Sequence, residues 1–241
     1  MTTGLSTAVI ILAAGSSSRM GKSENTAPKP FLDLNGFPVI YHSCQMFDKH
    51  PDVDHIVITL PKNKKSLYVD QIKKLPFRTR VSFIEGGSTR QGSSYNSLRF
   101  LKEQESAPDL VAIHDAARPF VSERMITEGL SMAKKYGAAQ PAIDLTDTLV
   151  GHEKNKISDY YERDQLKGVQ TPQCFSFSRI WQAHGEAAKK GLIATATDDA
   201  QLVFHLGYDV YIYQGSLNNF KITYQEDYER AKKYFLKLDL A

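Results

Sequence analysis

Several features are scarce or absent in this sequence of 241 residues, and each absence narrows the range of possible functions. No apolar run approaches the ~18 consecutive residues that a membrane-spanning helix needs, so we expect no membrane partner. The two cysteines, Cys44 and Cys174, are far apart and lack metal-ligand spacing, which favours free thiols in a reducing cytoplasm over a disulfide framework. The seven histidines form no HxxxH or HExxH pattern, so we expect no metal bound by protein side chains alone.

The excess of charge is also small. The formal net charge is +3, and the lysines are scattered rather than gathered into a stripe, so we expect no nucleic-acid partner. The length fits one large α/β domain or two small ones. The chain contains no internal repeat and no low-complexity linker, and we therefore predict a single domain over residues 1–241.

A loop of small residues follows the first apolar run, in AVIILAAGSSSRMGKS at residues 8–23. Three interpretations compete: a signal peptide, a P-loop, and a loop that holds another nucleotide. The apolar run is shorter than that of a signal peptide, and no Lys or Arg precedes it. A P-loop has four residues between its glycines, whereas five separate Gly15 from Gly21. These differences favour the third interpretation and leave a P-loop kinase or NTPase as a distant alternative.

Segments typical of strands and of helices alternate along most of the chain. This alternation predicts an α/β fold, a single Rossmann-like three-layer domain with a mostly parallel central sheet. In such sheets ligands bind beyond the carboxyl ends of the strands, where the loop after Leu12 lies. The predicted strands are 7–13, 54–60, 81–85, 109–114, 137–143 and 208–213, and the predicted helices lie near 38–49, 64–74, 91–104, 121–135, 177–190, 198–206 and 224–237.

The last predicted helix begins with Thr223-Tyr224-Gln225-Glu226, which is a capping-box sequence. Residues 144–173 differ from the rest, because they mix charges with Tyr160 and Tyr161 and show no sustained helical period. A structureless loop of this length is uncommon in a compact domain, so we predict an extended, hairpin-like excursion. A disordered surface loop is the alternative.

Small residues and cations gather beyond the first strand. Ala13, Ala14 and Gly15 let backbone N–H groups approach a phosphate or a base closely. Arg19 follows in the same loop, and Lys29 stands between two prolines that stiffen its backbone. Two cations beside an anion-binding loop suit phosphoryl or nucleotidyl transfer, because negative charge must be stabilised in the transition state.

Two further strand ends carry polar or small residues. Asp115 and Arg118 follow a predicted strand and form either a structural ion pair or a site for hydroxyls and phosphate. Gly86 and Gly87 permit close contact with a planar base, and Ser93 offers a hydroxyl. A plain strand-to-helix turn would have a similar sequence.

Eight motifs follow one another along the chain. They are Ala13-Ala14-Gly15 with Arg19-Met20-Gly21, Pro28-Lys29-Pro30-Phe31, Gly86-Gly87 with Arg90-Gln91 and Ser93, His114-Asp115-Ala116-Ala117-Arg118-Pro119, Asp147-Thr148, Gln170-Thr171-Pro172-Gln173, Thr197-Asp198-Asp199-Ala200, and Asn219-Phe220-Lys221-Ile222-Thr223. In this order they resemble the 2-C-methyl-D-erythritol 4-phosphate cytidylyltransferase family, nucleotidyltransferases with a glycosyltransferase-A-like fold. The resemblance extends over roughly residues 8–236, nearly the whole chain.

The resemblance implies an enzyme of isoprenoid precursor biosynthesis by the non-mevalonate pathway. Such an enzyme makes 4-diphosphocytidyl-2-C-methyl-D-erythritol and pyrophosphate from CTP and 2-C-methyl-D-erythritol 4-phosphate. It uses Mg²⁺, which is bound mainly through the CTP phosphates. A ribitol 5-phosphate (pentitol phosphate) cytidylyltransferase, with the same fold and nucleotide, is the nearest alternative.

The same resemblance implies roles for individual residues. Arg19 and Lys29 would stabilise charge on the α-phosphate of CTP, and Arg163 and Lys221 would position the acceptor phosphate for attack. The implied nucleotide site comprises Ala13, Ala14, Gly15, Gly86, Gly87, Ser93 and Ala116, and the implied acceptor site comprises Asp115, Arg118, Thr148, Thr171 and Thr197. Residues 144–173 would form an extended β-arm that embraces a second subunit, so that the partner in a homodimer supplies Thr148 and Arg163.

Overall fold

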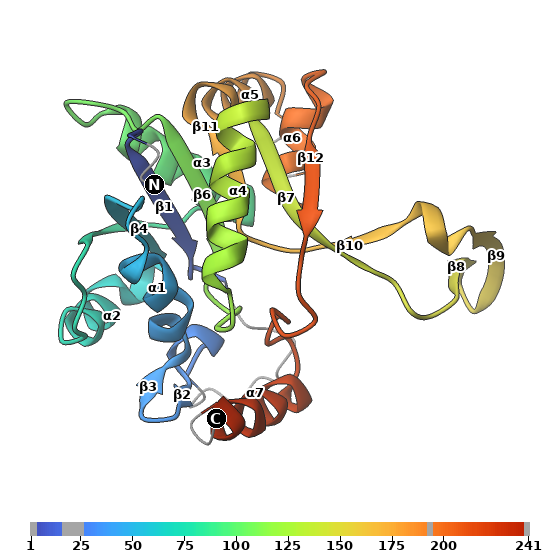
Figure 1. Ribbon diagram of the computed structural model, residues 1–241, viewed down its shortest axis with the longest axis horizontal. Helices are drawn as coiled ribbons and strands as arrows, with labels where there is room; N and C mark the ends of the chain where they lie inside the picture. Colours follow the sequence, from blue (N-terminus) through green and yellow to red (C-terminus); the bar gives the residue numbers. More distant parts are fainter. Residues whose placement is uncertain (1–3, 16–26, 192–194, 239–241) are drawn as a thin grey trace.

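A mostly parallel sheet forms the centre of the fold. The structure is a computed structural model that describes residues 4–15, 27–191 and 195–238 (Figure 1). Within these ranges the central sheet comprises β1 (Thr7–Leu12), β4 (His55–Leu60), β5 (Arg80–Glu85), β6 (Leu110–Asp115), β7 (Ala138–Asp144), β10 (Lys167–Val169), β11 (Gln173–Ser176) and β12 (Tyr211–Gln214). Two smaller antiparallel pairs are β2 (Asp33–Leu34) with β3 (Phe37–Pro38) and β8 (Leu149–Glu153) with β9 (Lys156–Tyr161).

The strand order brings the ends of β1 and β6 together. The order is β10-β7-β11-β6-β1-β4-β5, and β12 pairs with β7. Strands β6, β1, β4 and β5 are parallel, as are β12 and β7, whereas β11 and β10 are antiparallel to their neighbours. Leu12 is the register partner of Asp115, so the loops that follow β1 and β6 leave the same edge of the sheet. The predicted α/β fold with a mostly parallel sheet is confirmed.

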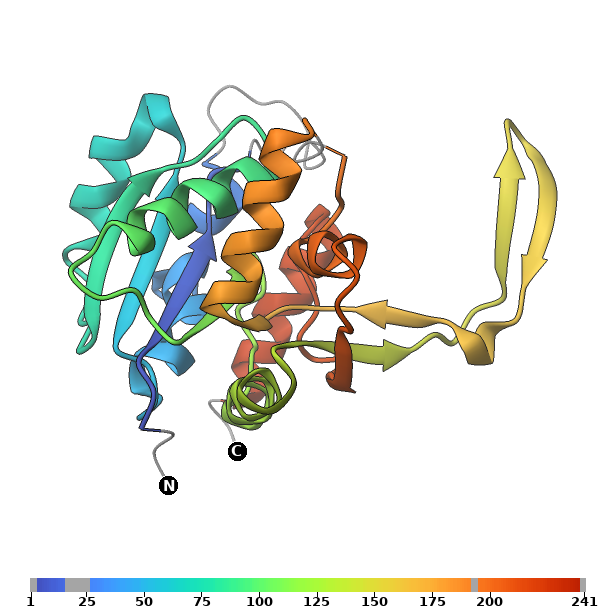
Figure 2. The same cartoon turned by 90° about the horizontal axis from the view of Figure 1, so that it is seen from above.

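Helices cover both faces of the sheet. Helices α1, α2 and α4 pack into the apolar cluster on one face, and α3, α5 and α6 pack into the cluster on the other (Figure 2). The helices of the described residues are α1 (Val39–Lys49), α2 (Lys65–Ile72), α3 (Arg90–Lys102), α4 (Glu123–Tyr136), α5 (Phe177–Lys189), α6 (Asp199–His205) and α7 (Gln225–Leu238), with 3₁₀ turns η2 (Lys29–Phe31), η3 (Lys62–Lys64) and η4 (Arg163–Gln165). None of these helices has the length and apolarity needed to cross a membrane.

The apolar sequence of β1 is explained by the helices that cover both faces of the sheet. Val9 and Ile11 are buried in one cluster, while Ala8 and Ile10 are buried in the other. A strand that is covered on both faces needs apolar residues at every position rather than at alternate ones. Both cysteines lie in the same interior as free thiols, and burial raises the pKa of Cys174 to about 12.

The predicted elements correspond closely to the observed ones, with boundary shifts of a few residues. All six predicted strands and all seven predicted helices are present. Four short strands were not predicted: β2, β3, β10 and β11. Strand β11 has only four residues, too few to show a periodicity, although it lies between β6 and β7 in the sheet.

Residues 144–173 contain the predicted hairpin. Strands β8 and β9 pair from Leu149↔Tyr161 to Glu153↔Lys156, and this pair projects away from the body of the molecule (Figures 1 and 2). The base of the projection is formed by β7 and the unpredicted β10, which pair antiparallel. We refer to residues 144–173 as the arm.

The capping box of the last helix is shifted by one residue from the prediction. The side chain that reaches back is that of Asp227, whose Oδ2 accepts the N–H groups of Thr223 and Tyr224 at 2.8 Å each. Glu226 was the predicted partner. Because α7 begins at Gln225 rather than one residue earlier, the acidic residue that can reach the orphan N–H groups is also one residue later.

Two helical glycines differ in the space around them, which predicts substitutions of opposite sign. A Cβ at Gly129 in α4 would lie 2.6 Å from Tyr213 Oη and 2.8 Å from Cys174 Sγ, whereas nothing lies within 4 Å of one at Gly185 in α5. We expect Gly129→Ala to lower the free energy of unfolding by ~1–3 kcal/mol through overpacking. The matched control Gly185→Ala should raise it by ~0.5–1 kcal/mol, because alanine favours the helix. Urea denaturation measures both, and a stabilising Gly129→Ala would contradict the described packing.

Candidate active site

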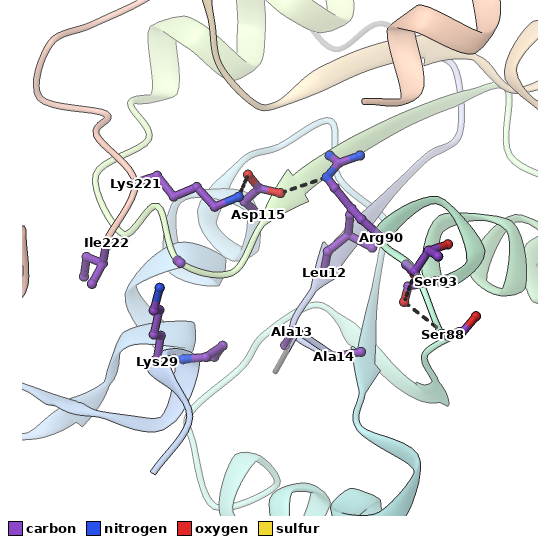
Figure 3. A pocket seen from close by; sticks show the side chains of 15 residues that line it. Leu12, Ala13, Ala14, Lys29, Ser88, Arg90, Ser93, Asp115, Lys221 and Ile222 are labelled. Atoms are coloured by element: carbon purple, nitrogen blue, oxygen red, sulfur yellow. Dashed lines mark hydrogen bonds and ion pairs between the residues drawn. The ribbon is translucent and has the colours of Figure 1, made fainter. Parts of the chain in front are cut away.

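A cavity of about 450 Å³ lies at the carboxyl edge of the sheet (Figure 3). The loop after β1, the turn between β5 and α3, and the end of β6 form its walls, and segments around Lys29 and Lys221 complete it. The residues that line it are Leu12, Ala13, Ala14, Gly15, Lys29, Pro30, Gly87, Ser88, Thr89, Arg90, Ser93, Asp115, Ala117, Lys221 and Ile222. The site thus lies at the edge predicted from the parallel sheet.

The two glycines after β5 allow close packing of the cavity wall. A Cβ at Gly86 would lie 2.2 Å from the Cβ of Ala14, so only glycine lets the loop after β1 approach this turn. A Cβ at Gly87 would lie 2.6 Å from the backbone carbon of Gly92. Ser93 completes the turn, because its Oγ accepts the N–H of Gly87 at 3.0 Å and donates to the carbonyl of Thr89 at 3.0 Å.

Three cations surround the carboxylate of Asp115. Lys221 Nζ donates to Oδ2 at 2.8 Å, Arg90 Nε donates to Oδ1 at 3.3 Å, and Arg118 Nε lies 3.7 Å from Oδ2. Figure 3 shows Asp115 between Lys221 and Arg90. Burial alone would raise the pKa of Asp115, but the charges of Arg90, Lys221 and Arg118 outweigh burial and hold it well below its usual range. Asp115 is therefore a fixed negative charge.

A buried hydrogen-bond network supports Asp115 from behind. The Nε2–H of His114 donates to the carbonyl of Arg118 at 3.0 Å, so Nδ1 is the ring atom that accepts the Thr171 hydroxyl at 2.9 Å. The same hydroxyl oxygen accepts the backbone N–H of Asp115 at 3.1 Å. Burial lowers the pKa of His114 to about 4, which keeps the ring neutral near pH 7. Asn219 Nδ2 donates to the carbonyl of Thr171 at 2.8 Å and extends the network.

Lys29 and Arg118 join the C-terminal segment to the site. Lys29 is buried in η2, and its ammonium donates to the carbonyl of Thr223. Arg118 NH1 donates to the carbonyl of Asn219 at 2.7 Å. These contacts place the segment that carries Lys221 over the end of β6, although about a hundred residues separate the two in sequence.

The structure brings most of the predicted site residues together, but not all of them. Those that line the cavity are Ala13, Ala14, Gly15, Lys29, Gly87, Ser93, Asp115 and Lys221. Gly86, Ala116, Arg118 and Thr171 are not among the lining residues, and Ala116 is fully buried in the core. Thr197 is exposed and bonded to the side chain of Gln201, and Thr148 and Arg163 lie on the arm. Arg19 lies outside the described residues.

Arg90 was included in a motif but given no role by the sequence. Its guanidinium bridges two carboxylates, because Nε donates to Asp115 and NH1 donates to Asp199 at 2.5 Å. The available signal was its place in sequence, directly after the N-cap Thr89 at a predicted strand-to-helix turn. The supporting residues His114 and Asn219 were also quoted in motifs without a role.

Solved structures with the same architecture identify the class. A 2-C-methyl-D-erythritol 4-phosphate cytidylyltransferase from Thermus thermophilus aligns with a TM-score of 0.74 at 32% identity, covering 93% of this chain and 96% of that one. A 4-diphosphocytidyl-2C-methyl-D-erythritol synthase from Anaerococcus prevotii aligns with a TM-score of 0.81 at 25% identity, covering 97% of each chain. The chain is a nucleotidyltransferase.

Sequence comparison identifies the family. The family model for 2-C-methyl-D-erythritol 4-phosphate cytidylyltransferase (IspD) matches residues 7–237. The cytidylyltransferase of that name from Bacillus mycoides is 37% identical over 226 residues, which cover 94% of this chain and 96% of the relative. The one from Clostridium tetani is 36% identical over 231 residues, which cover 95% and 90%. The chain belongs to the 2-C-methyl-D-erythritol 4-phosphate cytidylyltransferase family.

The network behind Asp115 predicts a contrast between two substitutions of Thr171. Thr171→Val keeps the shape but leaves the N–H of Asp115 and Nδ1 of His114 without their hydroxyl partner. We expect it to lower the free energy of unfolding by ~1–3 kcal/mol. Thr171→Ser keeps the hydroxyl and should cost only the ~0.8 kcal/mol of one buried carbon. Denaturant titration of both variants tests this prediction, and a serine variant as unstable as the valine variant would contradict it.

Proposed function

We propose that this chain transfers the cytidylyl group of CTP to 2-C-methyl-D-erythritol 4-phosphate. An oxygen of the acceptor phosphate attacks the α-phosphorus of CTP, the bond from that phosphorus to the β-phosphate oxygen breaks, and pyrophosphate leaves. The products are pyrophosphate and 4-diphosphocytidyl-2-C-methyl-D-erythritol. The observation that carries this proposal is the excess of positive charge in the cavity. Among the described lining residues, the cations are Lys29, Arg90 and Lys221, and the single carboxylate is that of Asp115.

The cationic side chains suit a reaction between two anions. CTP and the acceptor both bring phosphate charge, and the transition state concentrates negative charge on the α-phosphate oxygens. We assign Lys29, together with Arg19, to that charge, and Lys221 to the acceptor phosphate. Positioning and fixed positive charge supply most of the rate enhancement in such reactions, because the protein performs little covalent chemistry.

The nucleotide end of the cavity is built from small residues. Ala13, Ala14, Gly15 and Gly87 line it without bulky side chains. The close approach of Gly86 to Ala14 limits the width between the two loops. We assign this end to the cytidine of CTP. The narrow gap between the two loops can hold a pyrimidine and hydrogen-bond to it through backbone N–H and C=O groups, but it leaves little room for the larger purine ring.

Mg²⁺ would neutralise phosphate charge in this reaction. Asp115 is already paired with Arg90 and Lys221, so it is a poor ligand for an additional cation. The described residues of the cavity therefore do not fit a metal site of their own. We propose that Mg²⁺ is held mainly by the phosphates of CTP.

We further propose a homodimer in which the arm completes the site of the partner subunit. Every residue of β9 is exposed, and the exposed apolar side chains of the hairpin include Val150, Ile157, Tyr160 and Tyr161. Apolar side chains exposed together suit contact with another protein surface. Arg163 and Thr148 lie on this arm rather than in the cavity of their own chain, so their assigned roles require a second subunit.

An acceptor panel tests the proposed reaction. The purified protein is incubated with CTP, Mg²⁺ and each candidate acceptor, and pyrophosphate release is followed. We expect 2-C-methyl-D-erythritol 4-phosphate to give the highest kcat/KM, and CTP to be far better than ATP or GTP. A preference for ribitol 5-phosphate would replace the acceptor but keep the reaction, whereas phosphate transfer from ATP without pyrophosphate release would support the P-loop alternative. Action in the cytoplasm remains a prediction.

Replacement of Lys221 tests its role at the acceptor phosphate. Lys221→Ala removes one charge-assisted contact, so we expect at least a ~10-fold loss of kcat/KM for the acceptor. Lys62→Ala, which removes an exposed lysine of η3, is the matched control and should leave the kinetics unchanged. Folded Lys221→Ala protein with wild-type kinetics would exclude Lys221 from the site.

Mixed dimers test the arm. Lys221→Ala impairs the site in the cavity of its own subunit. Arg163→Ala impairs the arm, which contributes to the site of the partner subunit. In a mixed dimer one site carries both lesions and the other carries neither. Random reassortment makes about half of the dimers mixed, so about a quarter of wild-type activity should return. Mass spectrometry of tagged chains verifies that subunits exchange, and activity no greater than the mean of the two parents would place Arg163 in the site of its own chain.

A further inference from the structure

Side chains of alternating charge extend from the cavity into the core. Lys221 contacts Asp115, Asp115 contacts Arg90, and Arg90 contacts Asp199. His184 Nε2 lies 3.0 Å from Asp199 Oδ1, and both of these side chains are completely buried. The series joins the end of β6 to the first residue of α3 and the first residue of α6, so Arg90 connects three elements at one edge of the sheet.

The contact of Lys221 with Asp115 competes with the proposed binding of the acceptor phosphate by Lys221. An ammonium that binds the acceptor phosphate must give up at least part of its contact with Asp115. A buried carboxylate that loses its partner costs far more than an exposed one, because neither water nor another charge replaces the lost interaction. Asp115 therefore needs other cations if Lys221 is to move to the substrate.

Arg90 meets this requirement better than Arg118. Arg90 forms a hydrogen bond to Asp115 Oδ1, the oxygen that Lys221 does not use, whereas Arg118 Nε is 3.7 Å from the oxygen that Lys221 does use. Arg118 also directs NH1 toward the carbonyl of Asn219. Arg90 can thus remain in place when Lys221 leaves.

The position of Arg90 is fixed from behind by Asp199. Asp199 Oδ2 accepts Arg90 NH1, its Oδ1 contacts His184, and its backbone N–H donates to Gln173 Oε1 at 3.1 Å. Asp198, next to it, caps α6 by accepting the N–H of Gln201 at 2.8 Å. A carboxylate held at this many points gives the guanidinium a rigid anchor.

We propose that Arg90 is a positioning residue that keeps the Asp115 carboxylate neutralised and in place, so that Lys221 can transfer from Asp115 to the phosphate of the acceptor. This proposal rests on the proposed function, in which Lys221 binds that phosphate. It predicts that Arg90 governs the affinity for the acceptor more than the affinity for CTP, since only the fraction of protein with Lys221 released can bind the acceptor phosphate.

Steady-state kinetics of Arg90→Gln and Arg90→Lys test the proposal. Arg90→Gln should raise the KM of the acceptor ~10-fold, because a lower fraction of Lys221 is released, and should leave the KM of CTP within ~3-fold. Arg90→Lys retains the charge and should recover most of the loss. If Arg90→Gln does not fold, Asp199→Asn, which loosens the anchor, should raise the acceptor KM in the same way. An unchanged acceptor KM, an equal rise for CTP, or a lysine variant as poor as the glutamine variant would overturn the proposal.

A chemical measurement tests the same contact without the acceptor. The rate at which an amine-reactive reagent modifies Lys221 is followed by peptide mass spectrometry, with the exposed Lys62 as the internal control. Arg90→Gln should slow modification of Lys221 at least ~3-fold, because Asp115 then holds the ammonium more firmly. Unchanged or faster modification would overturn the proposal. If wild-type protein shows no cytidylyl transfer, the proposed function fails, whereas this readout still reports on the competition for Asp115.

Discussion

The carboxylate of Asp115, buried among Arg90, Arg118 and Lys221, is the interaction on which the rest of the site depends. It fixes the C-terminal segment over the sheet, because Lys221 and Arg118 both connect that segment to the end of β6. It also orders α3 and α6 through Arg90 and Asp199. Without this negative charge the cations would repel one another in a confined space, so the carboxylate makes their close approach possible.

The fold supplies the carboxylate at the right place. In-register pairing puts Leu12 beside Asp115, so the small-residue loop and the acidic residue leave the sheet together. The approach of Gly86 to Ala14 then closes the cavity on the side of β5. A ligand that combines a base with several phosphates can contact backbone at one end of such a cavity and cations at the other. The parallel sheet, the glycines and the charges thus all contribute to the binding of one ligand.

The sequence predicted the framework of the site better than its internal contacts. Gly15 and Gly87 follow parallel strands and Asp115 is the last residue of one, and the general rule for such sheets placed all three at one edge. No periodicity could place Lys29 or Lys221. Lys29 was identified as a cation between two prolines, close in sequence to the small-residue loop, whereas Lys221 was identified through the family resemblance. The contact of Arg90 with Asp199 joins residues 109 positions apart, and the support of Asp115 by Thr171 crosses 56 positions. Such contacts depend on side-chain packing in three dimensions, for which a single sequence carries no local signal.

The most direct test of this account is the titration of Asp115 itself. Carboxyl ¹³C NMR of protein labelled at aspartate, with the Asp115 resonance assigned by its loss in Asp115→Asn, follows the ionisation of this one group. Three neighbouring cations should keep Asp115 ionised as the pH is lowered through the ordinary aspartate pKa of ~3.9. A resonance that titrates at or above that value would show that the cations do not control the carboxylate, and would contradict the central role given to it here.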